Sequence, residues 1–353
     1  MLVTDLDTPC AVVDLDVMEA NLRRCQSYLD GAGIALRPHI KTHKIPEFAH
    51  LQLRLGARGI NCQKLGEAEV MVEAGITDIL LTYNIVGQVK LDRLVALAHR
   101  ADMKVVADSP EVVDGLSDAM HRAGLILPVL VECETGAQRC GVVGADAVAA
   151  LAQRIARSPG LHFLGLMTYP RFNTVAETAA RLTEARDACH RAGLDVEVIS
   201  NGGTPDLYRA HEAGIATEHR PGTYIYSDRS LVETKAYGGY DDCALRVHAT
   251  VVSRPAQDRC VIDAGSKSLS SDLLGLTGHG RIVEHPEWQI AALSEEHGHV
   301  HVPPGAATPR IGERVSIIPN HVCVVSNLHG RIHAARGGRM EIYHDVAARG
   351  KMQ

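Results

Sequence analysis

A dense group of basic and imidazole side chains lies near the N-terminus, where residues 37–44 read Arg-Pro-His-Ile-Lys-Thr-His-Lys. Residues 33–38 predict a β-strand, so this group is expected at the C-terminal end of that strand. A lysine at the end of a buried strand is costly unless it is paired, has a lowered pKa or is covalently bound. Lys41 is therefore a candidate for Schiff-base chemistry, and the alternative is a solvated loop lysine.

Two turns rich in small residues lie later in the chain. Residues 200–204 read Ser-Asn-Gly-Gly-Thr, and residues 220–224 read Arg-Pro-Gly-Thr-Tyr. Small residues at the start of a helix allow backbone N–H groups and hydroxyls to approach an anion. Each turn alone could be an ordinary strand-to-helix connection. Together with Lys41 they offer an amine for an aldehyde and a cradle for a phosphate, and this combination suggests pyridoxal phosphate (PLP).

His321 and Cys323 form a second candidate site. In a β-strand, residues two positions apart point to the same face, so the imidazole and the thiol would converge. An imidazole and a thiolate together favour Zn²⁺ among common divalent ions, with Mn²⁺ and Co²⁺ as alternatives. Taken alone, such a pair can also be a buried cysteine beside a chance histidine. Two protein ligands would leave coordination positions open for water and substrate, as a catalytic metal requires.

A regular alternation of strands and helices must position the first group of residues. Eight short apolar, β-branched segments predict strands at 33–38, 58–62, 78–82, 104–107, 127–132, 163–168, 195–199 and 218–221. Amphipathic segments such as 65–75 and 147–158 lie between them and predict helices. Eight such units favour an α/β fold with a closed (β/α)8 TIM barrel over an open sheet. In this fold, active-site groups lie at the C-terminal ends of the strands.

The pattern changes after about residue 240, where apolar and polar residues alternate without a long helical segment. This alternation predicts an antiparallel β domain of six or more strands, drawn from residues 243–254, 258–267, 288–302, 314–328 and 339–349. The strand-like segment 8–16 is too short to stand alone and is expected to join this domain. The predicted division is a barrel over residues 18–230 and a β domain formed by 1–17 with 231–353.

Composition and charge exclude several classes of protein. The 353 residues are 46% hydrophobic and 22% charged, which is typical of a globular chain. A formal net charge of −6 lacks the basic footprint of a nucleic-acid binder, although a small anion could bind locally. No segment has the pattern of a signal peptide or a membrane-spanning helix. Nine scattered cysteines without a CxxC pair are typical of a reducing compartment, so we expect a cytoplasmic protein.

Seven motifs occur in a fixed order along the chain. They are RPHIKTHK at 37–44, LGEAE at 65–69, ISNGGTP at 199–205, RPGTYIYSD at 220–228, VIDAGSKSLSSD at 261–272, LSEEHG at 293–298 and PNHVCVVSNL at 319–328. Together they resemble the fold-type III PLP enzymes of the D-threonine aldolase and D-serine dehydratase group. The resemblance implies an alanine-racemase-like barrel with a C-terminal β domain. It also implies a homodimer in which the β domain of one chain completes the site of the other.

The resemblance implies roles for individual residues. Lys41 would hold PLP through its amine, Tyr169 would face the cofactor, and Arg139 would lie near the pyridoxal ring. The alternative for Arg139 is a helix-start residue that pairs with Glu134. The full set implied to bind the cofactor is Lys41, Arg139, Tyr169, Ser200, Gly202, Gly203, Thr204, Gly222, Thr223 and Tyr224. His321 and Cys323 would hold a divalent metal, Zn²⁺ or Mn²⁺, and Lys41 and His321 are the catalytic candidates. Asp228 and Asp263 match family motifs but receive no role.

The implied activity is that of a PLP- and metal-dependent lyase acting on D-β-hydroxy amino acids. It would cleave substrates of the D-threonine type to glycine and an aldehyde. The alternative is dehydration of D-serine or D-3-hydroxyaspartate to a 2-oxo acid and ammonia. Within this group, aldolases tend to carry His-x-Asp at the metal position and dehydratases His-x-Cys, so Cys323 favours the alternative. The softer thiolate also suits Zn²⁺.

Two other functions share the barrel. A non-catalytic PLP carrier would be a single barrel, and the long C-terminal segment with its His-x-Cys pair argues against it. An amino-acid racemase would use a tyrosine from the C-terminal domain as its second base. No catalytic-tyrosine motif replaces the His-x-Cys segment, although Tyr237, Tyr240 and Tyr343 keep this alternative open.

Overall fold

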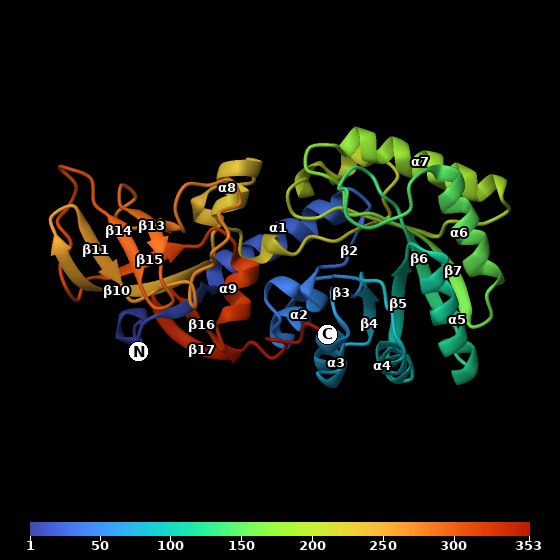
Figure 1. Cartoon of the computed structure of the whole chain (residues 1–353), viewed down its shortest axis with the longest axis horizontal. Helices are drawn as coiled ribbons and strands as arrows, with labels where there is room; N and C mark the ends of the chain where they lie inside the picture. Colours follow the sequence, from blue (N-terminus) through green and yellow to red (C-terminus); the bar gives the residue numbers. More distant parts are fainter. The chain divides into compact units, whose positions relative to one another are not determined.

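The computed structural model describes all residues from 1 to 353 and divides into two compact units. The barrel unit consists of residues 24–41, 46–222 and 351–353, and the β unit of residues 1–23, 42–45 and 223–350. Figure 1 labels the elements of both units along the chain. Each unit has its own sheet and its own hydrophobic core. Helix α1 (Leu15–Gly31) begins in the β unit and ends in the barrel unit.

The barrel unit is built on eight parallel strands in the order β2-β9-β8-β7-β6-β5-β4-β3. They are β2 (Ala35–Leu36), β3 (Ile60–Cys62), β4 (Asp78–Leu81), β5 (Asp102–Ala107), β6 (Leu127–Glu132), β7 (Leu161–Met167), β8 (Val198–Asn201) and β9 (Glu218–His219). The two end strands meet, because Asn61 N donates to Pro38 O at 2.8 Å and His39 pairs with Asn61 in a parallel bridge. The prediction of eight strands in a (β/α)8 barrel is confirmed.

Helices of the barrel unit connect successive strands. They are α2 (Pro46–Arg54), α3 (Leu65–Glu73), α4 (Gln88–Ala98), α5 (Pro110–Ala123), α6 (Ala145–Arg157) and α7 (Val175–Arg191), with short 3₁₀ turns η2 (Ile40–Thr42) and η3 (Leu207–Ala213). In α5, Pro110 occupies the first turn and Gly124 ends the helix at φ 67°, a conformation that favours glycine. No helix is both long and apolar enough to cross a bilayer.

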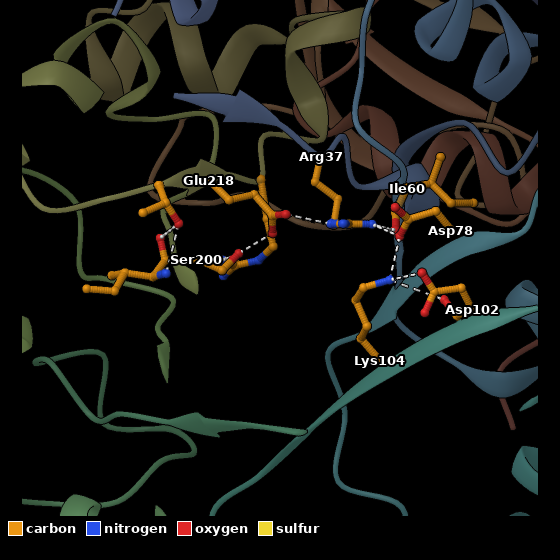
Figure 2. Close-up of polar contacts among 10 residues, drawn as sticks. Arg37, Ile60, Asp78, Asp102, Lys104, Ser200 and Glu218 are labelled. Atoms are coloured by element: carbon orange, nitrogen blue, oxygen red, sulfur yellow. Dashed lines mark hydrogen bonds and ion pairs between the residues drawn. The ribbon is translucent and has the colours of Figure 1, made fainter. Parts of the chain in front are cut away.

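A buried ionic network lies inside the barrel unit around Arg37 (Figure 2). The Arg37 side chain is 2% exposed, and its Nε donates to Glu218 Oε2 at 2.7 Å. Its Nη1 donates to Asp78 Oδ1 at 2.7 Å. Lys104 Nζ donates to the same carboxylate at 3.0 Å and to Asp102 at 2.7 Å. Each of the three carboxylates begins a strand, so the network marks the N-terminal end of the barrel.

The sequence prediction was wrong for Arg37, which does not belong to the basic group at the C-terminal mouth. Burial alone would lower the pKa of its guanidinium, but Glu218 and Asp78 raise that pKa above the ordinary value. Burial alone would raise the pKa of Asp78, but the cations Arg37 and Lys104 lower that pKa below its ordinary value. A guanidinium can be buried here because two carboxylates compensate the loss of water.

The β unit contains one nine-stranded sheet that is mostly antiparallel. Its strands are β1 (Cys10–Asp14), β10 (Leu245–Ala256), β11 (Arg259–Ile262), β12 (Arg281–Ile282), β13 (Gln289–Leu293), β14 (Gly298–His301), β15 (Arg314–Ile318), β16 (Arg331–Arg336) and β17 (Arg339–Asp345). Strand β1 pairs antiparallel with β10 and parallel with β16, as expected for an N-terminal strand that joins this domain. Short helices complete the unit: η1 (Val3–Asp5), η4 (Thr223–Ile225), α8 (Arg229–Lys235), η5 (Tyr240–Asp242) and α9 (Val322–Leu328).

The expectation that His321 and Cys323 lie in a strand was wrong. Strand β15 ends at Ile318, and after Pro319 and Asn320 the chain enters α9, with His321 as its N-cap residue. Proline cannot donate to a sheet ladder, which explains why pairing stops there. His321 and Cys323 therefore lie at the start of a helix instead of on one face of a strand.

Candidate active site

The C-terminal ends of the parallel strands bring five predicted segments to one mouth of the barrel. Lys41 follows β2, Arg139 follows β6 and Tyr169 follows β7. The turn at residues 202–204 follows β8, and Gly222 follows β9. Topology alone therefore gathers an amine, a guanidinium, an aromatic ring and two small-residue turns.

Lys41 is held in the short turn η2, directly after the first barrel strand. Its side chain is half-buried, and its backbone N–H donates to His39 Nδ1 at 3.4 Å. The other ring nitrogen of His39 lies 3.0 Å from Gln63 Oε1, so the imidazole is fixed at both ends. The lysine is therefore placed at the mouth by a turn of fixed backbone geometry.

Tyr169 and Arg139 form a stacked pair above the first small-residue turn. The Arg139 guanidinium carbon lies 4.8 Å from the centre of the Tyr169 ring, a cation–π distance. A Cβ added to Gly203 would lie 3.0 Å from Tyr169 Cε2, so the ring packs closely on this turn. The backbone N–H of Arg139 donates to Glu134 Oε2 at 3.2 Å. The alternative pairing with Glu134 thus involves the backbone of Arg139, and its guanidinium contacts the tyrosine.

The turn after β8 requires glycine at position 202. Gly202 has φ 87°, and a Cβ there would overlap the imidazole of His219. His219 Nε2 donates to Gly203 O at 3.0 Å, which ties the turn to the end of β9. Burial lowers the pKa of His219 to about 4, so this imidazole is neutral at physiological pH. His219 supports the turn, and no pattern in the sequence distinguished it from other histidines.

Thr204 and Ser200 differ in what their hydroxyls do. Gly222 N donates to Thr204 Oγ1 at 3.1 Å, so this hydroxyl joins the two small-residue turns. Ser200 Oγ lies 2.5 Å from Glu218 Oε1 and accepts from Arg220 Nη1 at 2.8 Å. The Ser200 hydroxyl is therefore occupied inside the barrel, where it extends the network of Figure 2.

Arg220 is a buried cation at the start of the second small-residue turn, and it is not among the residues predicted to bind the cofactor. Its Nη2 donates to Thr168 O at 2.7 Å, and the residue is 5% exposed. Burial lowers the pKa of Arg220 to about 10, and Glu218 and Glu132 oppose that shift. Its position directly after β9 could have identified it, because the same rule selected Lys41 after β2.

His321 is oriented by Asp228 in the β unit. His321 Nδ1 donates to Asp228 Oδ2 at 2.9 Å, and the carboxylate is fully buried. Asp228 also accepts from Leu231 N at 3.0 Å as the N-cap of α8, and from Val322 N at 3.2 Å. Such a carboxylate fixes the ring and leaves Nε2 for a ligand. Asp228 thereby gains a role that the sequence did not assign.

Cys323 completes this group. Its Sγ lies 3.2 Å from Thr42 Oγ1 and 3.7 Å from Thr223 Oγ1. Burial would lower the pKa of His321, but the hydrogen-bonded Cys323 and Asp228 raise it to about 11. The imidazole and thiol therefore converge as predicted, although a helix start brings them together and not a strand face. Tyr224, the last residue of the second small-residue turn, is buried.

Asp263 lies outside this group. Its Oδ2 accepts from Thr8 Oγ1 at 2.6 Å, and its Oδ1 accepts from Thr250 N at 2.8 Å. These contacts tie the segment before β1 to β10. Asp263 is therefore a structural residue of the β unit.

The residues present fit both PLP and a divalent ion. At the barrel mouth, Lys41 supplies an amine, a Cβ at Gly202 would overlap His219, and the buried Asn201 Oδ1 beside this turn has no protein partner. In the β unit, no three His, Cys, Asp or Glu side chains form a complete metal site. His321 and Cys323 would supply two ligands, and the proton on His321 Nε2 is the one that a metal would replace.

Comparisons with known proteins match each of two parts of the chain to a family model. Residues 13–230 match the family described as alanine racemase, N-terminal domain, and residues 244–335 match a serine dehydratase domain model. A D-threonine aldolase from Arthrobacter sp. is 38% identical over 98% of this chain and 93% of its own length. A D-threo-3-hydroxyaspartate dehydratase from Delftia sp. is 30% identical over 99% of this chain and 96% of its own.

Solved structures give the same result. The D-threonine aldolase from Filomicrobium marinum superposes with a TM-score of 0.93 at 34% identity, covering 100% of this chain and 99% of its own. The Delftia dehydratase superposes with a TM-score of 0.89 at 29% identity, covering 98% of both chains. Two solved variants of D-threo-3-hydroxyaspartate dehydratase replace a histidine and a cysteine two positions apart, and the cysteine variant is described as metal-free. This chain therefore belongs to the alanine racemase N-terminal-domain family, in the group that contains the D-threonine aldolases and hydroxyaspartate dehydratases.

Proposed function

We propose that this chain is a PLP- and divalent-metal-dependent lyase that cleaves D-β-hydroxy amino acids of the D-threonine type. The observation that carries the proposal is the pairing of two constellations in one chain. Lys41 with its small-residue turns suits PLP, and His321 oriented by Asp228 beside Cys323 suits a metal. The 38% identity to a D-threonine aldolase over nearly the whole chain supports the aldolase activity.

The two bound groups would supply what amino-acid side chains lack. PLP supplies an electron sink for negative charge at the substrate Cα. A divalent ion supplies a Lewis acid that lowers the pKa of the β-hydroxyl. The remaining requirements fall to the protein: an amine at the barrel mouth, a fixed imidazole, and a cradle for an anion.

Each of these residues has a defined task in the cleavage. Overall, the β-hydroxyl loses its proton, the Cα–Cβ bond breaks and a proton is returned to Cα, which yields glycine and an aldehyde. Lys41 Nζ would carry the proton at Cα. Asp228 would keep the His321 ring oriented throughout, and the turn containing Gly203 would bind the phosphate while Thr204 ties it to Gly222.

Dehydration is the second candidate, and Cys323 is the observation that favours it. The two solved variants of D-threo-3-hydroxyaspartate dehydratase involve the same His-x-Cys spacing, and the cysteine variant is metal-free. In that reaction Lys41 would remove the Cα proton and hydroxide would leave Cβ. The released enamine would tautomerise to an imine, and one water molecule would hydrolyse it to a 2-oxo acid and ammonia.

Product analysis separates the two reactions. Purified full-length protein, supplied with PLP and Zn²⁺ or Mn²⁺, would be offered D-threonine, D-serine and D-threo-3-hydroxyaspartate separately. Glycine with acetaldehyde from D-threonine is the expected result, and a 2-oxo acid with ammonia from all active substrates would contradict it. Cys323→Asp would show whether the metal ligand sets the product ratio, and Lys41→Ala is the inactive control.

The proposal extends to the setting of the enzyme. The resemblance supports a homodimer, which sedimentation velocity of the PLP-loaded protein would detect. All nine cysteines are free, which supports a cytoplasmic location that fractionation of the source cells would test. Metal analysis of protein purified without added ions would distinguish Zn²⁺ from Mn²⁺.

A further inference from the structure

The four residues after Lys41 have an unusual place in the fold. Residues 42–45, here called the post-lysine segment, belong to the β unit, whereas the chain on both sides belongs to the barrel unit. All four are buried: Thr42, His43 and Ile45 are 0% exposed, and Lys44 is 7% exposed. A short segment with a lysine and a histidine is buried only where its polar groups find partners.

Those partners lie at both ends of helix α9. Thr42 Oγ1 is 3.2 Å from the Sγ of Cys323, in the first turn of the helix. Lys44 Nζ donates to Asn327 Oδ1 at 2.9 Å, in the last turn. The same Asn327 oxygen also accepts from Gly350 N at 3.2 Å. The post-lysine segment is therefore fastened to the helix that begins at His321 and Cys323.

The backbone of the segment is also constrained. Lys44 has φ 58°, and its carbonyl accepts from Ala348 N at 3.1 Å. His43 Nδ1 accepts from Ile45 N at 3.0 Å. Lys41 and Thr42 share the single 3₁₀ turn η2. A movement of Thr42 is therefore passed to Lys41 through one peptide bond inside one turn.

The Thr42–Cys323 contact changes character when a metal is bound. A thiol can either donate or accept, but a thiolate that ligates a metal can only accept. The Thr42 hydroxyl must then donate to Sγ, so the metal fixes the direction of this hydrogen bond. Hydrogen bonds to a ligand atom orient it and tune its affinity for the metal.

We propose that Thr42 is a positioning residue that couples metal binding at His321 and Cys323 to the placement of Lys41. This inference rests on the PLP and metal sites of the proposed function. Coupling of this kind is reciprocal, so PLP must change the affinity for the metal by the same factor as the metal changes the affinity for PLP. The prediction can therefore be measured without turnover.

The experiment measures Zn²⁺ affinity in full-length protein with and without PLP, and records the cofactor absorbance and circular dichroism as Zn²⁺ is added. In the wild type, PLP is expected to change the Zn²⁺ dissociation constant about fivefold or more, and Zn²⁺ should perturb the cofactor spectrum. Thr42→Val keeps the shape but removes the hydroxyl. It should weaken Zn²⁺ binding about tenfold and reduce the coupling to less than about twofold.

Two further variants make the result specific. Thr42→Ser retains the hydroxyl and should restore both the coupling and the spectral response. Thr250→Val removes a hydroxyl that contacts Thr8 Oγ1 at 2.6 Å in the same unit, and it should keep the wild-type coupling. If Thr42→Val does not fold, Lys44→Met removes the contact with Asn327 and must lower the coupling instead.

Several results would overturn the inference. Wild-type protein that binds Zn²⁺ and PLP independently would refute the coupling and leave the proposed function intact. Full coupling in Thr42→Val, or in Lys44→Met where the first variant does not fold, would also refute it. Wild-type protein that binds neither Zn²⁺ nor Mn²⁺, or forms no lysine-linked PLP, would refute the proposed function and this inference together.

Discussion

The Arg37 network and the His321 group both remove charged side chains from water, but they satisfy them differently. Arg37 and Glu218 are each 2% exposed, and the guanidinium donates to two carboxylates. The His321 side chain is 27% exposed, and only its Nδ1 is taken by a carboxylate. The Arg37 network, here called the closed network, can only stabilise the fold. The His321 group, here called the open group, keeps a ring nitrogen and the Cys323 sulfur side by side, where a ligand could bind both.

This comparison predicts that the two regions fail in different ways. Damage to the closed network should lower the free energy of unfolding and spare the chemistry of the molecules that still fold. Damage to the open group should remove activity and spare the fold. The four experiments below test this difference, beginning with the largest expected effect.

Cys323→Ala and His321→Ala should each lower kcat/KM for D-threonine by about a thousandfold, or about 4 kcal/mol, because the Lewis acid is lost. A chelator should reduce the wild-type activity equally and leave both variants unaffected. The unfolding free energy, measured in urea, should change by about 1 kcal/mol or less in Cys323→Ala. His321→Ala should cost about 1–3 kcal/mol, because the buried Asp228 carboxylate loses one donor. Cys189→Ala, a buried cysteine on α7, is the control and should lose stability while it keeps activity. Wild-type activity in Cys323→Ala would contradict the metal assignment.

Arg37→Met should destabilise the protein by about 3–5 kcal/mol, because it leaves the buried Glu218 carboxylate without its cation, whereas Asp78 keeps Lys104. The measurement is the unfolding free energy, with kcat of the folded fraction expected to stay near wild type. Arg154→Met, which breaks an exposed ion pair with Asp114, is the matched control and should leave the unfolding free energy unchanged. The double variant Arg37→Met with Glu218→Met should be more stable than Arg37→Met. An equal or lower stability of the double variant would show that the charges themselves are not the cause.

His219 gives the barrel mouth its own pH dependence. Burial lowers its pKa to about 4 from an ordinary 6.5, so between these values the unfolded chain binds a proton that the folded chain does not. Stability is therefore complete above about pH 6.5 and falls by up to about 3 kcal/mol as the pH drops to about 4. His219→Gln, which keeps a donor for Gly203 O, should flatten the profile of unfolding free energy against pH. Burial also lowers the pKa of His248 to about 4, so its contribution to the pH dependence of stability is present in both the wild type and the variant. If the unfolding free energy of the wild type and of His219→Gln fell equally steeply with pH, the conclusion that His219 is buried and neutral would be contradicted.

The sequence was sufficient for the barrel because most of the parallel strands are short apolar runs that are buried on both faces. Residues 127–132 are an example, since the predicted and observed bounds of β6 coincide. The rule that barrel sites lie at strand ends also located Lys41 and the turns after β8 and β9.

The partners of charged residues could not be predicted in the same way. Asp228 is 93 positions from His321, and Glu218 is 181 positions from Arg37, so only the folded chain shows these pairs. Periodicity also misassigned His321, because β-branched isoleucines at 317 and 318 before it and valines at 322 and 324 after it continue the strand pattern. Pro319 was the local signal for a break, and it explains why α9 starts where it does.

Asp228→Asn is the smallest of the four changes and tests the open group most directly. Both oxygens of Asp228 accept: Oδ2 from His321 Nδ1 and Val322 N, and Oδ1 from Ser230 Oγ and Leu231 N. An asparagine must turn its amide N–H₂ toward one of these two pairs of donors. We expect Zn²⁺ affinity, measured by competition with a chromophoric chelator, to fall about tenfold to a hundredfold.

The matched control for this change is Asp263→Asn. Its carboxylate also accepts on both oxygens, from Thr8 Oγ1 and Thr250 N, but it does not contact a proposed metal ligand. Its Zn²⁺ affinity should stay within about twofold of the wild type. Its stability should fall by about 1 kcal/mol or less, because the asparagine can accept from Thr250 N and donate to the Thr8 hydroxyl. Equal losses of Zn²⁺ affinity in both variants would mean that the β unit as a whole, and not the orientation of one imidazole, determines metal binding. A loss in Asp228→Asn alone would show that a single buried carboxylate makes the open group a metal site.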